Sequence, residues 1–277
     1  MGDERFIGKW TLDDVAWDRF DSSKVDPDLL RLVKAAALVE QNGIDYGVYL
    51  NNVFKDDPEF RKAVDAWSVE EVRHGQALGR WAALADPQFD FEAAFARFRD
   101  GYQLPLDVTT SVRGSHAGEL MARCIVETGT SSYYSALHDA AEEPVLREIC
   151  RRIAADELRH YKLFYSYMRR YLQREKLGTW SRLRIGLKRI GESEDDELAY
   201  AYYAANGNAA GYDRVANTRA YALRAYRVYR PLHVERAIAM VFKAVGLKPY
   251  GWLNGALARV AASFIRWRIG RLARAGA

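Results

Sequence analysis

Two similar stretches of the sequence carry an acid and a histidine three residues apart. The first, VEEVRHG, contains Glu71 and His74. The second, ADELRHY, contains Glu157 and His160. Because residues i and i+3 lie on one face of an α-helix, each pair can reach a single ion. The spacing predicts two metal-binding pairs on two different helices.

Two further acids, Glu40 and Glu127, lie inside apolar stripes of other expected helices. The second of these acids follows the first by 87 positions, and the two Glu-x-x-His pairs are 86 positions apart. Two helical hairpins related by pseudo-twofold symmetry would give this repeat, with four carboxylates and two imidazoles around one site. Each acid also has an ordinary explanation. Glu40 can reach water from a helix boundary, and Glu127 can pair with Arg123 one turn earlier.

The chemistry of the set favours bound metal. Four carboxylates buried together without cations would have raised pKa values, at a cost of several kcal/mol each, whereas two divalent ions compensate most of that charge. The set has no thiolate and is dominated by carboxylate oxygens, which favours iron or manganese over zinc or copper.

These residues require long helices to position them. Asp26-Pro27 and Asp57-Pro58 have the form of an N-cap followed by proline at the first helical position. The first apolar stripe runs from Leu29 through Ile44 to Gly47. Strand signals are nearly absent, so the expected fold is all-α. Helices are expected at about 58–84, 90–103, 114–140 and 142–174. The expected organisation is an N-terminal segment (1–26), a four-helix bundle (27–176) and a basic helical C-terminal extension (177–277).

Composition limits the other classes of function. The chain has 277 residues, of which 49% are hydrophobic and 28% are charged, as in folded globular proteins. It has two cysteines, no CxxC pair and no signal peptide in MGDERFIGKW, which favours a reducing, cytoplasmic compartment and excludes a rubredoxin-type or zinc-knuckle site. No uncharged apolar run approaches the roughly 18 residues of a membrane span, so any membrane contact is expected to be peripheral.

The C-terminal tail is strongly basic. Residues 231–277 hold eight basic side chains against one acid, a local net charge of +7 in a chain whose total is +4. One helical face carries Leu253, Leu257, Val260, Phe264 and Trp267, with Arg259, Arg266 and Arg274 expected roughly opposite. This pattern is typical of an interfacial amphipathic helix, and also of a final helix docked on the core or on a second subunit in a homodimer. An acidic protein is another candidate partner, whereas no motif for binding nucleic acid accompanies the charge.

Three strings give the chain a family resemblance: EEVRHG (70–75), ETGT (127–130) and DELRHY (156–161). Over residues 27–175 the sequence resembles the ferritin-like di-iron carboxylate superfamily, and is most similar to the acyl-carrier-protein desaturases. The resemblance implies a ferritin-like four-helix bundle that holds two iron ions, with manganese as the alternative. The implied ligands are Glu40, Glu71, His74, Glu127, Glu157 and His160, with Glu71 and Glu157 as bridges.

The resemblance also implies roles beside the ligands. Thr130 falls beside the oxygen-binding face, and Asp156 supports a ligating histidine and links it towards the surface. Arg73 and Arg159 lie off the ligand face, where they either pair with carboxylates or are simply exposed. Trp10 or Trp17 serves an electron path, or else each is a tryptophan of the packed core or of a lid. Small side chains near the site leave room for an acyl chain or serve close helix packing: Gly43, Gly47, Gly129, Ser131 and Ser132.

The implied activity is that of an oxygen-dependent oxidoreductase acting on an unactivated C–H bond of an acyl or lipid substrate, by desaturation or hydroxylation. Such an enzyme takes its electrons from an external donor such as ferredoxin and its reductase. Two alternatives remain. One is an iron-oxidising or peroxide-reducing protein like ferritin or rubrerythrin, and the other is a non-catalytic helical scaffold.

Overall fold

The computed structural model describes residues 10–192, 196–207 and 211–274, and the regular elements of this part of the chain are all helices, without a strand. The expectation of an all-α fold is therefore confirmed for these residues. The stretch MGDERFIGK and the last three residues of the expected C-terminal helix lie outside the described part. None of the described helices is long and apolar enough to cross a membrane.

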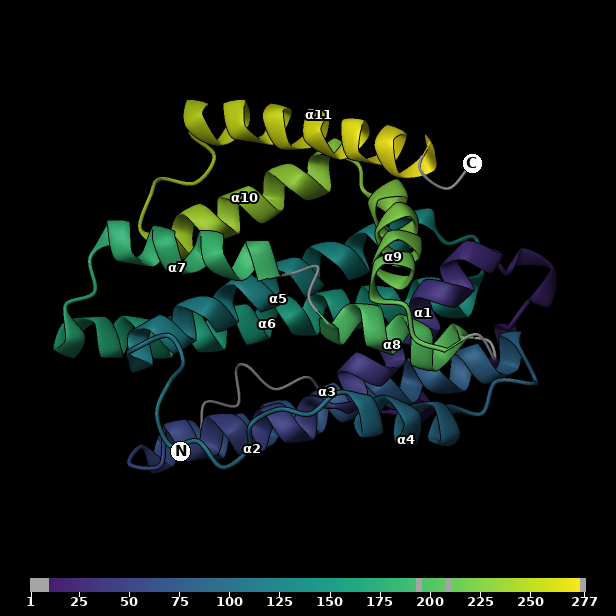
Figure 1. The fold of residues 1–277 in the computed structure, drawn as a ribbon, viewed down its shortest axis with the longest axis horizontal. Coiled ribbons are helices and arrows are strands. Elements are labelled where there is room, and N and C mark those ends of the chain that lie inside the picture. The colour runs from purple at the N-terminus through teal and green to yellow at the C-terminus, as the bar shows by residue number, and fades with distance from the viewer. Residues whose placement is uncertain (1–9, 193–195, 208–210, 275–277) are drawn as a thin grey trace.

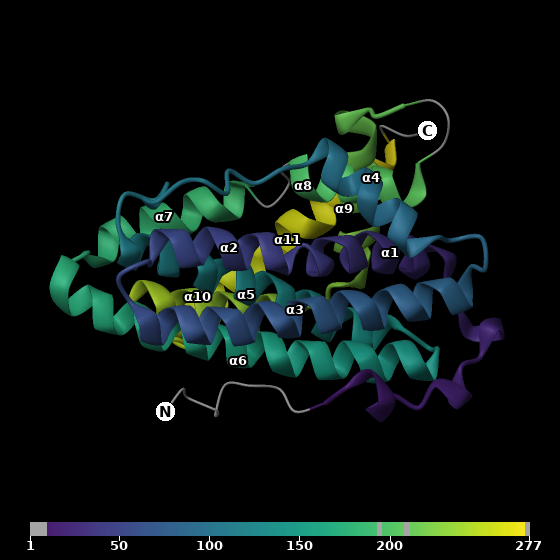
Figure 2. The ribbon, with the colours of Figure 1, turned by 90° about the horizontal axis from the view of Figure 1, so that it is seen from below.

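The long axis of the molecule is formed by helices that run side by side (Figures 1 and 2). They are α1 (Pro27–Gln41), α2 (Gly43–Val53), α3 (Pro58–Ala85), α5 (His116–Ala140) and α6 (Pro144–Glu175). Short connections make α5 and α6 one antiparallel hairpin, and make α1 with α2 antiparallel to α3. At one end lie α4 (Phe91–Gly101), α8 (Asp196–Asn206) and α9 (Arg214–Val228). The outer layer holds α7 (Thr179–Gly191), α10 (Pro231–Val245) and α11 (Trp252–Arg274).

The helices begin where the capping signals predict. The Asp26 carboxylate accepts a hydrogen bond of 3.0 Å from the Leu29 N–H, and the Asp57 carboxylate accepts one of 3.0 Å from the Phe60 N–H. Glu143 caps α6 in the same way. Each cap satisfies N–H groups that have no partner within the helix, and the proline that follows has none to satisfy. The expected bounds of α3, α4, α5 and α6 are within two residues of those observed.

The first helix differs from the prediction of one continuous stripe. The helix is interrupted at Asn42, whose ψ of 1° is not helical and separates α1 from α2. The break changes the face that α2 presents, and Ile44, expected in the buried stripe, is 53% exposed. Gly43 and Gly47 instead face α3 at close range. A Cβ on Gly43 would lie 2.3 Å from the Cβ of Glu71, so this glycine serves close packing beside the site.

The segments outside 27–176 pack on the same core. Residues 10–26 form short 3₁₀ turns in which Trp10 is buried. Beyond the end of α6 at Glu175, α10 and α7 pack on α5, and α8 packs on α1 and α4. Val245 of α10 joins one hydrophobic cluster with α5 and α6, and Tyr202 of α8 joins another with α1 and α4. The C-terminal extension therefore covers the helices that carry the predicted site.

Candidate metal centre

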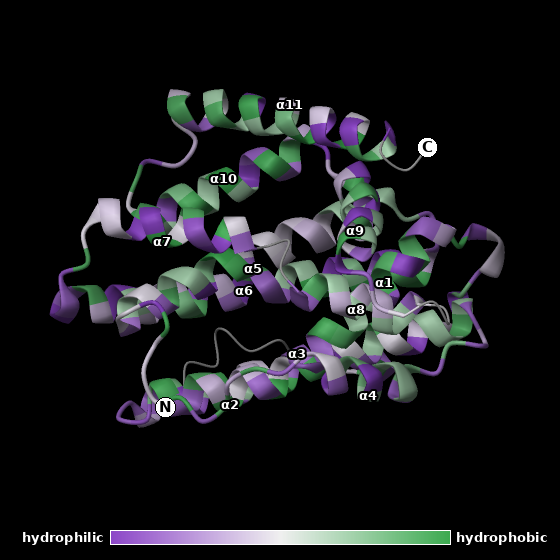
Figure 3. Cartoon of the chain, in the orientation of Figure 1, coloured by the Kyte–Doolittle hydropathy of each residue, from purple (hydrophilic) through white to green (hydrophobic). Residues whose placement is uncertain are grey.

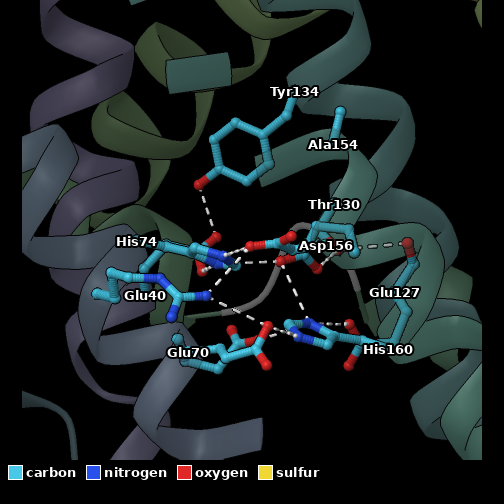
Figure 4. A network of polar contacts seen from close by, with 12 residues as sticks. Glu40, Glu70, His74, Glu127, Thr130, Tyr134, Ala154, Asp156 and His160 are labelled. Atoms are coloured by element: carbon cyan, nitrogen blue, oxygen red, sulfur yellow. Dashed lines mark hydrogen bonds and ion pairs between the residues drawn. The ribbon is translucent and has the colours of Figure 1, made fainter. Parts of the chain in front are cut away.

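The predicted ligands meet in the interior of the molecule. Helix α1 brings Glu40, α3 brings Glu71 with His74, α5 brings Glu127 and α6 brings Glu157 with His160. Figure 4 labels Glu40, His74, Glu127 and His160 in one network of polar contacts. All six are buried and form two overlapping groups, each with its ligand atoms within 4.8 Å of one another. The groups are Glu40, Glu71, His74, Glu157 and Glu71, Glu127, Glu157, His160. Each can hold a metal ion, and Glu71 and Glu157 belong to both.

The two imidazoles are oriented by carboxylates on their outer side. The Nε2 atom of His74 lies 3.0 Å from Oδ2 of Asp156, and the Nε2 atom of His160 lies 3.2 Å from Oε2 of Glu70. An ionised carboxylate only accepts hydrogen bonds, so each Nε2 carries a hydrogen. The Nδ1 atom of each ring is then the one left to bind a metal.

The Nδ1 atoms face the shared carboxylates. Nδ1 of His74 lies 3.2 Å from Oε1 of Glu157, and Nδ1 of His160 lies 3.0 Å from Oε1 of Glu71. Three of these atoms, Oε1 of Glu71, Oε1 of Glu157 and Nδ1 of His160, are buried and face one another as ion-pair partners without forming a hydrogen bond of good geometry. Unsatisfied buried polar atoms are costly, and here they converge on the centre of the two groups. The residues present therefore fit a pair of cations.

The two remaining ligands are each held by a donor from outside the ligand set. The Tyr134 hydroxyl donates a hydrogen bond of 2.6 Å to Oε1 of Glu40, and the Arg123 guanidinium donates one of 2.9 Å to Oε1 of Glu127. The pairing of Glu127 with Arg123, considered as an alternative to metal binding, is thus confirmed. It leaves Oε2 of Glu127 facing the site, 3.7 Å from Nδ1 of His160.

Asp156 lies at the centre of a polar network next to the ligands. It is fully buried and accepts a hydrogen bond of 2.7 Å from the indole N–H of Trp10, in addition to its contact with His74. Arg73 lies 3.4 Å from the same carboxylate, which Arg159 also contacts. The structure therefore shows the contact between Asp156 and a histidine that the expected role requires, and it pairs both arginines with this carboxylate.

Thr130 and the small residues nearby also have assigned contacts. The Thr130 hydroxyl is half-buried and donates to Oε2 of Glu157. Ser131 donates to a backbone carbonyl of α6 and Ser132 to one of α10. Gly129 is exposed, with nothing within 4 Å of where a Cβ would lie. The two serines therefore bind neighbouring helices, as the packing alternative predicts.

Two residues of the centre were not predicted. Glu70 precedes Glu71 as Asp156 precedes Glu157, again 86 positions apart, so the same repeat contains the signal for it. Tyr134 lies on the ligand face of α5. Its partner is a residue 94 positions away, which no local pattern indicates.

The acids and imidazoles perturb one another strongly. Burial, reinforced by the carboxylates of Glu71 and Glu157, raises the pKa of Glu40 to about 8. Burial and the Glu157 carboxylate also raise the pKa of Glu127 well above its ordinary range. Burial lowers the pKa of His74, but its close contacts with the Glu157 and Glu40 carboxylates outweigh that effect and raise the pKa to about 9. Near neutral pH, bound protons therefore reduce the repulsion among these carboxylates in the metal-free protein. Bound cations would compensate the same negative charge.

Comparison with protein-family models returns no match, and comparison with curated proteins returns none either.

Proposed function

We propose that this protein is a dinuclear metal-dependent oxidoreductase that uses dioxygen to oxidise an unactivated C–H bond of an acyl or lipid substrate. The single observation that carries the proposal is the pair of buried ligand groups that share Glu71 and Glu157. A Glu from each of two helices and a Glu-x-x-His pair from each of two others is the ligand pattern of ferritin-like di-iron and di-manganese bundles. This pattern supports a ferritin-like bundle built from α1, α3, α5 and α6.

The donor set supports iron, with manganese as the alternative. Each group offers three carboxylates and one imidazole and contains no thiolate. Hard carboxylate oxygens with a minority of imidazole nitrogens suit Fe²⁺ and Mn²⁺ better than zinc or copper. A reduced iron pair held there would supply the means to activate dioxygen.

The electron balance of the reaction accounts for the external donor. Desaturation removes two hydrogen atoms from adjacent carbons, and dioxygen takes these, two electrons from the donor and two protons from solvent to give two molecules of water. Hydroxylation inserts one oxygen atom and releases the other as water, also with two electrons from the donor and two protons from solvent. We propose ferredoxin and its reductase as this donor, and an acyl chain, free or on an acyl-carrier protein, as the substrate. The acyl class is supported by the sequence resemblance.

Two residues next to the ligands take specific roles in this proposal. The Thr130 hydroxyl holds a proton at Oε2 of Glu157. Thr130 is itself half-buried on α5, so it lies between the ligands and the partly exposed side of this helix. Asp156 fixes the tautomer of His74 and joins it to Trp10, whose ring is stacked parallel to the imidazole at 6.0 Å. The line from Trp10 through Asp156 to His74 supports an electron route into the centre.

Metal content tests the proposal directly. The protein is reconstituted anaerobically with Fe²⁺, freed of excess metal and subjected to elemental analysis, beside the variants Glu71→Ala and Glu157→Ala. We expect about two irons per chain in the wild type and loss of both in each variant. Glu119→Ala is the matched control, because Glu119 is also a buried glutamate but bonds to Tyr49 and Ser111 away from the site.

Absence of stoichiometric iron or manganese in the wild type, or equal loss of metal in the control, contradicts the metal centre. The activity is tested separately with loaded protein, reduced ferredoxin and acyl-carrier-linked fatty acids, followed by mass spectrometry of the released chains. New double bonds or hydroxyl groups support the proposal. Oxygen consumption without any modified chain leaves iron oxidation, as in ferritins, as the better description.

A further inference from the structure

Helix α11 is docked on the molecule through a different face from the one its apolar stripe suggests. It packs on α10 and α9, and its buried residues are Asn254 and Ala258. The stripe of Leu253, Leu257, Val260, Phe264 and Trp267 is 41–65% exposed along its whole length. Docking on the core therefore explains the position of the helix, but it does not explain why five large apolar side chains are left exposed on its other face.

The end of the stripe adjoins a cavity of about 500 Å³ between α9 and α11. The lining includes four arginines and no acid, namely Arg214, Arg219, Arg268 and Arg271, although Arg214 also pairs with Asp196, which lies outside the lining. Val215, Ala222 and Leu272 supply apolar wall, so the cavity combines positive charge with apolar surface. Its size and charge suit a phosphate ester group.

The arginines and the stripe form one surface. The guanidinium of Arg271 lies 5.4 Å from the centre of the Trp267 ring, which in turn contacts Phe264 at 5.6 Å between ring centres. Val215, on the cavity wall, is 68% exposed. Figure 3 shows the hydrophilic colour gathering at the C-terminal end of α11, near α9. Because α11 continues through Arg274, seven residues after Trp267, this arginine falls on the side of the stripe and not opposite it as expected.

From this surface we infer that the α9–α11 face binds the surface of an anionic phospholipid membrane, with the stripe inserted among the lipids and the arginine cavity receiving lipid phosphates. Aromatic and leucine side chains settle at the boundary between headgroups and acyl chains, and arginines beside them meet the phosphates. At 23 residues, α11 extends over roughly 35 Å, which offers one long contact line. The net charge of +7 in residues 231–277 is complementary to anionic lipid.

The inference does not rest on the metal centre, since none of the ligands belongs to α9 or α11. Its test is flotation of the full chain with vesicles of phosphatidylcholine alone and of phosphatidylcholine with phosphatidylglycerol. We expect the protein to float with the mixed vesicles and much less with the neutral ones. Light scattering of the protein without vesicles measures its oligomeric state.

Two paired variants separate the contributions. Phe264→Ser with Trp267→Ser removes part of the stripe and should abolish flotation, whereas Arg268→Gln with Arg271→Gln should weaken binding to the mixed vesicles by roughly thirtyfold. The control for the stripe is Val69→Ser, a similarly exposed apolar residue on α3. The control for charge is Arg61→Gln with Lys62→Gln, two exposed cations on the same helix. All positions are exposed or half-buried, and unchanged circular dichroism shows that each variant is folded.

Three results overturn the inference. One is flotation that neither stripe nor arginine variant reduces. A second is a dimer that dissociates in the Phe264→Ser, Trp267→Ser variant while no form of the protein floats, which assigns the face to a second copy of the chain. The third is binding of inorganic phosphate or of an acidic acyl-carrier protein to the arginine surface without any binding to vesicles.

Discussion

At the scale of single residues, the centre depends on which nitrogen of each histidine is free. Asp156 and Glu70 occupy equivalent positions on the outer side of His74 and His160, and each accepts a hydrogen from Nε2. A neutral amide in place of either carboxylate would no longer raise the basicity of the imidazole or fix its tautomer.

We therefore expect Asp156→Asn and Glu70→Gln each to weaken metal binding by roughly 10- to 100-fold without removing a ligand. Titration with Fe²⁺ or Mn²⁺, read by calorimetry, measures the change. The matched control is Asp139→Asn, because Oδ2 of Asp139 lies 3.1 Å from Nε2 of another buried histidine, His233, away from the ligands. Equal weakening in all three variants would show an effect on the fold and not on the ligands.

Proton competition gives metal binding a defined dependence on pH. In the metal-free protein the pKa of Glu40 is raised to about 8 and that of His74 to about 9, so both hold protons at pH 7. Binding of a cation must displace these protons. The apparent affinity should therefore rise as pH increases from 6 towards 9, by roughly tenfold per pH unit for each proton released. Metal titrations at fixed ionic strength over this range measure it, and an affinity that falls with increasing pH would contradict the assigned protonation.

The sequence predicts the ligands better than their supports for a geometric reason. Helical spacing within each Glu-x-x-His pair is local, and the 86-residue repeat relates one pair to the other. The bond from Tyr134 to Glu40 joins two helices whose rotation about their axes depends on packing across the whole core. Local patterns carry no information about that rotation.

At the scale of elements, glycine sets how closely the helices approach. Gly75 follows His74 in the first motif, and a Cβ there would lie 2.6 Å from the backbone N of Gln41 and 2.9 Å from the carbonyl oxygen of Ala37. The equivalent residue of the second motif is Tyr161, whose hydroxyl bonds to Met240 of α10. The pseudo-twofold repeat thus holds for the ligands and ends at the helix interfaces.

This difference makes Gly75→Ala and Gly129→Ala a matched pair. Both glycines are inside helices, but a Cβ on Gly129 would have nothing within 4 Å of it, whereas a Cβ on Gly75 would meet backbone atoms that cannot swing aside. We expect Gly75→Ala to lower the free energy of unfolding by about 1–3 kcal/mol and Gly129→Ala to raise it by about 0.5–1 kcal/mol. Urea unfolding of the two variants decides, and effects of the same sign would contradict the close approach of α1 and α3.

Helix starts were predictable and the break at Asn42 was not. Each Asp-Pro start is a local signal in which the side chain bonds to the first turn. Directly after the break, Gly43 lies against the side chain of Glu71, a contact between different helices that no local pattern indicates. In the sequence, the apolar stripe continues from α1 into α2, so the pattern alone does not indicate the break.

At the scale of the whole molecule, the helices after residue 176 were expected only as a basic extension. They cover α5 and α1 through small and aromatic residues, including Ala244 and Tyr202. Their own patterns indicate helices, but which face meets which neighbour depends on surfaces far away in the sequence. The tail shows this plainly, since α11 docks through Asn254 and Ala258 and leaves its most apolar face outside.

The centre joins both helical hairpins, so its occupancy should be felt by the entire fold. Two cations would replace proton-mediated contacts among four buried carboxylates contributed by α1, α3, α5 and α6. A ligand that binds only the folded state at about 100 times its Kd adds about 2.7 kcal/mol to the free energy of unfolding. For a protein of this size, that corresponds to a rise in Tm of roughly 5–10 °C.

We therefore expect anaerobic Fe²⁺ or Mn²⁺ to raise the Tm of the wild-type protein by this amount, and a chelator to reverse the change. Differential scanning calorimetry provides the measurement. Glu127→Gln should abolish the shift because it removes a ligand, whereas Glu119→Gln, on the same helix and equally buried, should keep it. Because α5 and α6 carry half of the ligands and pack along their whole length, the transition should stay single in both states. An unchanged Tm in the presence of either metal would show that bound cations do not stabilise the buried carboxylates of the core.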